Sequence, residues 1–332
     1  MRSPLVKVPS LKHVLLNQLE KALSRNYEDN DVCFTDFSQK QNNTSDAIQA
    51  TEDETDRLID RFQSTNPPQI PLHKKQNIAP VLYTSALPQR WAASGYPSVS
   101  KTPSEASEKL VAILEQARSS LSSSQRLSIE AQLWLEFQIE THRPGWIAFR
   151  LTPAGVNQWL TYLSKASPAP LFERAKRTPQ IPTVGCSGLS TQPLAELLWQ
   201  AQYTHACCCR LLRQVQPPWP QPEKEDAKSS FHTLQEQRLL HALVNTADDL
   251  FWIPYRWPTQ QYLLLLKSSA PLCQAFERFC RTGFNSLAQQ SAIHHSQVEP
   301  TRSRFFILIL ATQNLLKVLL EEHLGEPAPE RL

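Results

Sequence analysis

Three consecutive cysteines follow a histidine in the stretch QYTHACCCRLLRQ, which covers Gln202–Gln214. Cysteine and histidine can ligate zinc or take part in thiol chemistry, so their spacing decides what is possible here. Adjacent helical positions point about 100° apart, so Cys207, Cys208 and Cys209 cannot converge on one ion. Zinc sites favour repeated pairs separated by two to four residues, and the sequence has no such repeat. We therefore predict small packed side chains on a helix and no metal.

Other chemistry finds equally little support in the sequence. His294 and His295 are adjacent and lack a third ligand at useful spacing, so we interpret them as a solvent-facing loop pair. Phosphate-cradling loops need glycine, but the chain has only 7 glycines beside 26 prolines. It contains neither a P-loop nor a dinucleotide fingerprint, so we expect no cofactor and identify no catalytic residue.

The cellular location follows from cysteine usage and hydropathy. The 7 cysteines are an odd number without framework spacing, which is typical of reduced thiols in the cytoplasm. No continuous apolar run approaches the ~18 residues that span a bilayer, and the N-terminus does not resemble a signal peptide. We expect a cytoplasmic protein without a membrane partner.

The net charge of +3 hides an uneven distribution. From Glu28 to Phe62 there are ten acidic and three basic residues, whereas Pro67–Gln180 holds thirteen basic and seven acidic ones. The second block can meet a polyanion, although a charge run is also typical of a solvated face. From Trp199 to Leu332 the count is thirteen basic and twelve acidic residues, which is nearly balanced.

The N-terminal part mixes helical and strand patterns. Helices are predicted over Ser10–Ser24 and Lys101–Glu115, the latter from a proline in the first turn followed by glutamates. Ser128–Glu140 alternates apolar and polar residues, which predicts a half-buried strand. A turn at Arg143–Gly145 and a second strand over Trp146–Leu151 would complete a hairpin.

The C-terminal part has only helical periodicity, and a proline-rich segment precedes it. The sequence predicts an α+β fold class, with a small N-terminal α+β domain joined by a Pro-rich linker to an all-α helical bundle. The predicted boundaries are residues 1–165, with an acidic insertion at about 28–66, then a linker at 166–193 and a helical domain at 194–332.

Several segments resemble the accessory domains of arginyl-tRNA synthetases, in the same order along the chain. APVLYTSALPQRWA, starting at Ala79, and PGWIAFRL, starting at Pro144, resemble elements of the N-terminal tRNA-binding domain. QYTHACCCRLLRQ, AFERFCR, RFFILILATQNLLK and the ending GEPAPERL resemble the C-terminal anticodon-binding domain of the DALR type. The synthetase catalytic domain has no counterpart, because no HIGH-like or KMSKS-like motif is present and only residues 164–193 lie between the modules.

The resemblance implies a truncated synthetase paralogue that binds tRNA or a tRNA-like RNA without catalysis. Two alternatives stay open: a protein-interaction module that has lost RNA binding, and an arginine–tRNA ligase component whose catalytic domain lies on another chain. Enzymatic activity is therefore uncertain, and we expect none. Several family residues are replaced, with Ala86, Cys207, Cys280 and Leu332 standing at positions of Asn, Arg, Tyr and Met.

The candidate RNA-binding residues combine aromatic rings for stacking with basic groups for phosphate. They are Tyr83, Arg210, Arg213, Phe276, Arg278, Phe279, Arg281, Arg304 and Lys317. Phe276 and Phe279 are three residues apart and can equally be core residues of a helix. The arginines can also form surface ion pairs with Glu277, Glu321 or Glu322.

Overall fold

The computed structural model of the chain describes residues 10–28, 70–75, 81–93, 102–165, 192–214, 231, 233–252, 258–290 and 298–331. The predicted acidic insertion, most of the predicted linker and the histidine pair at positions 294 and 295 lie outside the described residues. We refer to residues 10–165 as the N-terminal half and to residues 192–331 as the C-terminal half.

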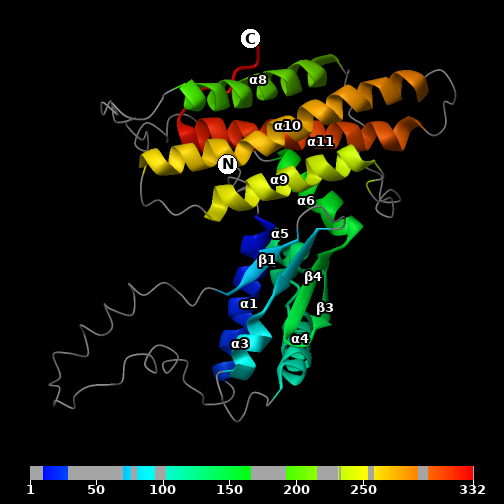
Figure 1. Cartoon of the computed structure of the whole chain (residues 1–332). Coiled ribbons are helices and arrows are strands. Elements are labelled where there is room, and N and C mark those ends of the chain that lie inside the picture. Colours follow the sequence, from blue (N-terminus) through cyan, green and yellow to red (C-terminus); the bar gives the residue numbers. More distant parts are fainter. Residues whose placement is uncertain are drawn as a thin grey trace, which may run out of the picture.

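The N-terminal half is an α+β structure in which helices pack on an antiparallel sheet (Figure 1). The sheet has the strand order β1-β2-β4-β3, and every neighbouring pair is antiparallel. In chain order its elements are α1 (Leu11–Glu28), β1 (Leu72–Lys74), β2 (Leu82–Ser85), α3 (Leu87–Ala93), α4 (Pro103–Ser119), the 3-10 turn η2 (Gln125–Leu127), α5 (Ile129–Leu135), β3 (Phe137–Arg143), β4 (Trp146–Leu151) and α6 (Pro153–Lys165).

The described part of the C-terminal half is helical, as the sequence predicts. Its helices are α8 (Gln192–Gln214), α9 (Leu234–Trp252), α10 (Pro258–Gln290) and α11 (Val298–Val318), and α11 continues into the π-helical turn η4 (Leu319–Leu324). Helix α11 packs against α8, α9 and α10, so it forms the centre of this half. The α+β fold class is confirmed, whereas the DALR type of the bundle stays a prediction.

The predicted helix starts are confirmed by their capping contacts. Thr102 adopts extended backbone angles, and its side chain accepts the N–H of Glu105, which fixes the start of α4 at Pro103. Ser10 caps α1 in the same way, because its Oγ accepts the N–H of His13 at 3.1 Å. The strand expected over Ser128–Glu140 is wrong in its first part, because α5 occupies Ile129–Leu135 and β3 begins at Phe137.

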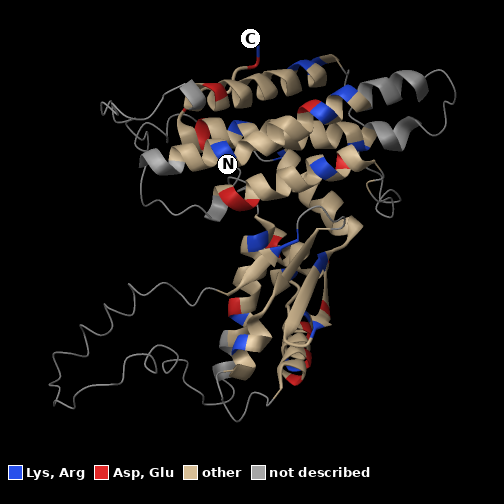
Figure 2. Cartoon of the chain, in the orientation of Figure 1, with Lys and Arg blue, Asp and Glu red and all other residues tan. Residues whose placement is uncertain are grey.

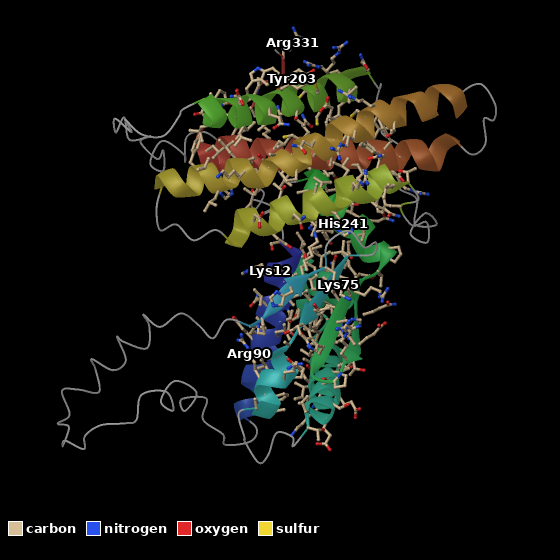
Figure 3. All side chains as sticks on the ribbon, in the orientation of Figure 1. Lys12, Lys75, Arg90, Tyr203, His241 and Arg331 are labelled. Atoms are coloured by element: carbon tan, nitrogen blue, oxygen red, sulfur yellow. The ribbon has the colours of Figure 1, made fainter. Side chains whose placement is uncertain are left out.

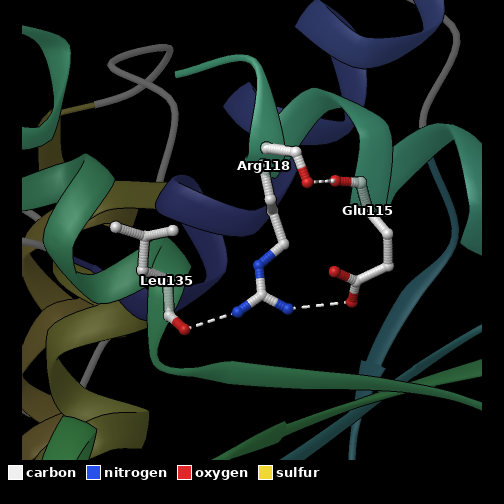
Figure 4. Close-up of polar contacts among 4 residues, drawn as sticks. Glu115, Arg118 and Leu135 are labelled. Atoms are coloured by element: carbon white, nitrogen blue, oxygen red, sulfur yellow. Dashed lines mark hydrogen bonds and ion pairs between the residues drawn. The ribbon is translucent and has the colours of Figure 1, made fainter. Parts of the chain in front are cut away.

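Capping at both ends explains why α5 is a helix despite its alternating pattern. The side chain of Ser128 accepts the N–H of Ala131 at 3.1 Å, which satisfies the first turn. At the other end, Nη2 of Arg118 donates to the carbonyl oxygen of Leu135 at 2.5 Å, and Nη1 pairs with Glu115 at 2.9 Å (Figure 4). In the helix Leu133 and Trp134 are both buried, whereas a strand would place them on opposite faces.

The two halves share one apolar core. Helix α1 packs against α9, and α6 packs against α11, so the N-terminal half docks end-on against the helices (Figure 1). Within the described residues, the stretch Ser303–Leu324 is long and apolar enough to cross a membrane by length and composition, and 61% of its apolar window is buried. Its contacts with α6, α8 and α9 are those of a core helix, and a cytoplasmic location stays a prediction.

A substitution at Gly155 tests how closely α6 packs against its neighbours. A Cβ atom at this position would lie 2.6 Å from Cβ of Glu136 and 2.7 Å from Cδ1 of Leu151. Gly155→Ala should therefore lower the free energy of unfolding by about 1–3 kcal/mol through overpacking. Helix propensity alone predicts the opposite sign, a gain of about 1 kcal/mol. Urea unfolding decides between the two, and increased stability in Gly155→Ala would contradict this packing. Ala154→Gly measures the propensity effect at the neighbouring position.

Candidate nucleic-acid interface

Four of the predicted RNA-binding arginines lie on the outer surface of two adjacent helices. Arg210 and Arg213 are exposed on α8, and Arg278 and Arg281 are exposed on α10. Helix α8 packs directly against α10, so the two pairs lie on neighbouring helices of the C-terminal half. We call the exposed residues of these two helices, with those added below, the α8–α10 surface.

Two of these arginines already have partners. Nη2 of Arg281 lies 2.6 Å from Oε1 of Glu277, with side chains 76% and 59% exposed, so the pair contributes under about 1 kcal/mol. Nη2 of Arg213 donates to the carbonyl oxygen of Glu330 at 2.6 Å. The side chains of Arg210 and Arg278 make no hydrogen bond or ion pair with another described residue, so among the four arginines these two guanidinium groups are the ones open to a ligand.

The basic candidates on α11 are less exposed than the four arginines on α8 and α10. Arg304 and Lys317 are only partly exposed, and Nε of Arg304 is buried. Helix α11 is packed between the other helices of this half, which limits the reach of both side chains. Lys317 nevertheless acts electrostatically on His205 of α8 and, together with Arg213, on Cys209, so it lies close to the inner side of α8.

The predicted stacking role of Tyr83 is corrected by its burial. Tyr83 is 0% exposed, its ring meets Phe137 edge-on, and its hydroxyl donates to Oδ2 of Asp248 at 2.6 Å. Phe276 and Phe279 are 4% and 3% exposed, and Phe279 stacks on Phe305 with 4.7 Å between ring centroids. All three rings are core residues here, so none presents a face to a base.

A different aromatic pair is exposed instead. Trp199 and Tyr203 on α8 are 58% and 45% exposed, and their rings stack at 5.0 Å with 19° between planes. They are four residues apart and lie on the same face of the helix as Arg210, so the three side chains form a ridge along α8. Figure 3 shows Tyr203 on this outer side. Their spacing was visible in the sequence, but their exposure was not.

Tyr203 connects the ridge with α10. A side-chain hydrogen bond with Cys207 raises the pKa of Tyr203, and the negative charge of Glu277 on α10 acts in the same direction. The positive charge of Arg210 acts against this rise. The tyrosine therefore lies within electrostatic reach of groups on both helices of the α8–α10 surface.

The C-terminal segment borders the ridge on its other side. Gln202 donates to the carbonyl oxygen of Pro327 at 3.2 Å, and Nδ1 of His205 lies 2.8 Å from that of Pro329. Together with Arg213, these side chains fix the segment along α8. Burial lowers the pKa of His205, so its ring is neutral near pH 7 and donates from Nδ1 to this carbonyl.

Two of the three consecutive cysteines lie on the inner side of α8, whereas Cys207 is partly exposed. Cys208 and Cys209 are buried, and Nε2 of Gln313 donates to Sγ of Cys209 at 3.1 Å. Burial raises the pKa of Cys273 to about 11 and that of Cys280 to about 12, both on α10. Thiols with such pKa values stay protonated near pH 7, which disfavours nucleophilic chemistry. Within the described residues, no group of three or more histidine, cysteine or acidic side chains could hold a metal ion.

Charges of both signs are interspersed over the described helices (Figure 2). A ligand of the α8–α10 surface would therefore be bound by a few local contacts rather than by a large positive field. Comparison of the chain with known protein families, curated proteins and solved structures gave no match.

Burial of Cys273 predicts a specific pH dependence of stability. The folded thiol has a pKa of about 11, whereas a thiol in the unfolded chain ionises near 8.5. The folded state thus binds more protons between these values, so this contribution to stability is lost as the pH rises from about 8.5. Over this window Cys273→Ala should weaken the pH dependence of the unfolding free energy by about 1 kcal/mol per pH unit.

Urea unfolding at pH 7 to 10 with a reducing agent measures this effect. Leu272→Ala is the matched control, because it removes a neighbouring buried side chain without removing a thiol. Its pH dependence should equal that of the unaltered protein. Parallel curves for Cys273→Ala and the unaltered protein would show that the thiol is not buried in this way.

Proposed function

We propose that the chain is a non-catalytic RNA-binding protein, with tRNA or a tRNA-like RNA as its ligand. The observation that carries the proposal is the exposed ridge of Trp199, Tyr203 and Arg210 on α8, with Arg278 exposed on the adjacent helix α10. Exposed aromatic rings next to guanidinium groups are what single-stranded RNA loops require, because unstacked bases pack on rings while arginines meet phosphates. The resemblance of both halves to synthetase accessory domains, DALR bundle included, supports the choice of tRNA.

The aromatic and the basic side chains of this surface would contribute to RNA binding in different ways. Stacking of one base on an exposed ring contributes about 1–3 kcal/mol and depends little on sequence. Each arginine–phosphate contact releases counterions, so it makes the affinity depend on salt. The aromatic pair would thus supply affinity at any salt concentration, whereas Arg210 and Arg278 would supply the salt-dependent part.

Direct packing between the halves favours a non-catalytic protein over a ligase component with its catalytic domain on another chain. The contacts of α1 with α9 and of α6 with α11 occupy the space between the two modules. A catalytic domain inserted there would have to displace them. The sequence itself carries no motif for binding ATP or arginine.

A protein-interaction module is the second candidate function, and the composition of the same α8–α10 surface supports it. Tryptophan, tyrosine and arginine are the residues most enriched at protein interaction hot spots. The balanced charge of residues 199–332, thirteen basic against twelve acidic, also suits a protein partner better than a long phosphate backbone. Salt dependence separates the two candidates.

Binding of labelled tRNA across a salt series tests the proposal. Replacing Arg210 and Arg278 together with alanine should lower the slope of log affinity against log salt by about two units. Replacing Trp199 and Tyr203 with alanine should weaken binding by about tenfold or more at every salt concentration, with little change in slope. Arg238→Ala and Leu264→Ala are matched controls, since both side chains are exposed elsewhere on the helical half.

Two outcomes would overturn the proposal. The first is the absence of salt-dependent tRNA binding by the unaltered protein. The second is unaltered affinity and slope in both double variants, provided that circular dichroism shows intact folds. Either result moves the protein-interaction module to first place.

Catalytic activity is tested separately. Because the chain lacks the synthetase nucleotide-binding domain, the purified protein should catalyse no arginine-dependent pyrophosphate exchange and charge no tRNA. Pyrophosphate exchange measured without arginine gives the background. Activity above that background would contradict the non-catalytic assignment.

A further inference from the structure

A buried carboxylate joins the two halves of the chain. Asp248 on α9 is 7% exposed and accepts three hydrogen bonds from the N-terminal half. Its Oδ1 atom accepts from Oγ of Ser10 at 2.7 Å and from the backbone N–H of Lys12 at 3.1 Å. Its Oδ2 atom accepts from the hydroxyl of Tyr83 at 2.6 Å. We call this contact region between α1, β1, β2 and α9 the seam.

The donors come from two elements that the sheet and helix packing hold together. Ser10 and Lys12 form the N-terminus of α1, while Tyr83 comes from β2. Ser10 already caps the N–H of His13, so Asp248 satisfies a second backbone N–H of the same helix end. A carboxylate is favoured at a helix N-terminus, because it also meets the positive end of the helix dipole.

A second layer of polar contacts lies next to the first. Nζ of Lys74 on β1 donates to Oδ1 of Asn245 at 2.7 Å and to the carbonyl oxygen of His241 at 3.3 Å. Burial lowers the pKa of Lys74 to about 8, although the charges of Asp248 and Asp249 oppose this shift. Lys74 therefore remains mainly protonated at pH 7. Lys74 of the N-terminal half thus supplies a donor to two acceptors on this face of α9.

The contact between α6 and α11 is of a different kind. Nδ2 of Asn314 on α11 donates to the carbonyl oxygens of Leu163 at 3.3 Å and Ser164 at 2.5 Å. These are carbonyls of the last turn of α6, which helix geometry leaves without partners. Asn314 thus ties the end of α6 to α11 by side-chain hydrogen bonds, so this contact would act as the hinge if the seam opened.

We propose that Asp248 is a conformational latch that holds the two halves in one orientation. Apolar packing is non-directional, whereas the three hydrogen bonds of Asp248 require one placement of α1 and β2 against α9. Loss of the latch lets the seam open about the contact between α6 and α11, while each half keeps its fold. The latch does not depend on RNA binding, and it is tested without RNA.

Tyr83→Phe is the most informative variant. It removes the hydroxyl that Asp248 accepts but keeps the ring that packs against Phe137. Tyr162→Phe is its matched control, because the hydroxyl of Tyr162 bonds Gln132 and Gln158 within the N-terminal half. Asp248→Ala removes all three hydrogen bonds and should have the larger effect.

Two readouts report opening of the seam. The first is hydrogen exchange of the Lys12 amide, which Asp248 protects directly. The second is acylation of Lys74 by a water-soluble active ester, because the hydrogen bonds of Nζ to Asn245 and to the carbonyl oxygen of His241 compete with this reaction while the seam is closed. In Tyr83→Phe both rates should rise by about tenfold, which is the effect of losing one hydrogen bond to a charged group. Exchange in α4 and acylation of the exposed Lys109 should stay unchanged.

Each possible result of these measurements either supports or overturns the latch. Faster exchange and acylation in Tyr83→Phe, with Tyr162→Phe like the unaltered protein, support the latch. Equal rises in the hydrogen-exchange rates of α1 and α4 would mean that the hydroxyl of Tyr83 only stabilises the N-terminal half. This result overturns the latch. Unchanged rates in Tyr83→Phe also overturn it, since the halves would then be held by apolar packing alone. Should Asp248→Ala fail to fold, Tyr83→Phe gives the decision by itself.

Discussion

The buried carboxylate of Asp248 is the interaction on which the arrangement of the molecule depends. It accepts hydrogen bonds from two separate elements of the N-terminal half while its own helix, α9, belongs to the other half. A buried carboxylate without these donors would be strongly unfavourable, so the position of α9 and that of α1 with β2 are set together. The sheet and the α8–α10 surface thereby keep a defined spatial relation.

Helix α8 then gives the C-terminal half its two distinct sides. Its inner side carries the buried cysteines, whose small side chains allow close packing against α10 and α11. Its outer side carries Trp199, Tyr203 and Arg210, which make no comparable core contacts. One edge of this ridge is bordered by the C-terminal segment, which Gln202 and His205 hold in place. The cysteines are thus structural, and the chemistry of recognition lies on the opposite side of the helix.

The sequence predicts the local features of the fold well where capping residues are strong. The helices predicted over Ser10–Ser24 and Lys101–Glu115 are confirmed, and the structure shows that Ser10 and Thr102 cap their starts. The strand expected from Ser128 fails, because a short alternating pattern fits a capped helix too. Arg118, which satisfies the end of α5, comes from a helix that is separate in the chain.

The candidate site is less predictable, because exposure is a property of tertiary packing. The core interpretation of Phe276 and Phe279 is confirmed, whereas Tyr83 is buried against Phe137 and bonds a residue 165 positions away. Trp199 and Tyr203 have the spacing of any helical face, and a single sequence does not distinguish an exposed pair from a buried one. Their function therefore depends on a structural observation.

Crosslinking is the most direct test of RNA recognition by this ridge. A tRNA carrying 5-bromouridine in its loops can be irradiated with the protein and the attached peptides identified by mass spectrometry. Our account predicts that the crosslinks map to Trp199 or Tyr203 on α8, because stacked rings react with the bromouridine base. Crosslinks found only in other segments, or none under conditions where the tRNA is bound, would contradict it.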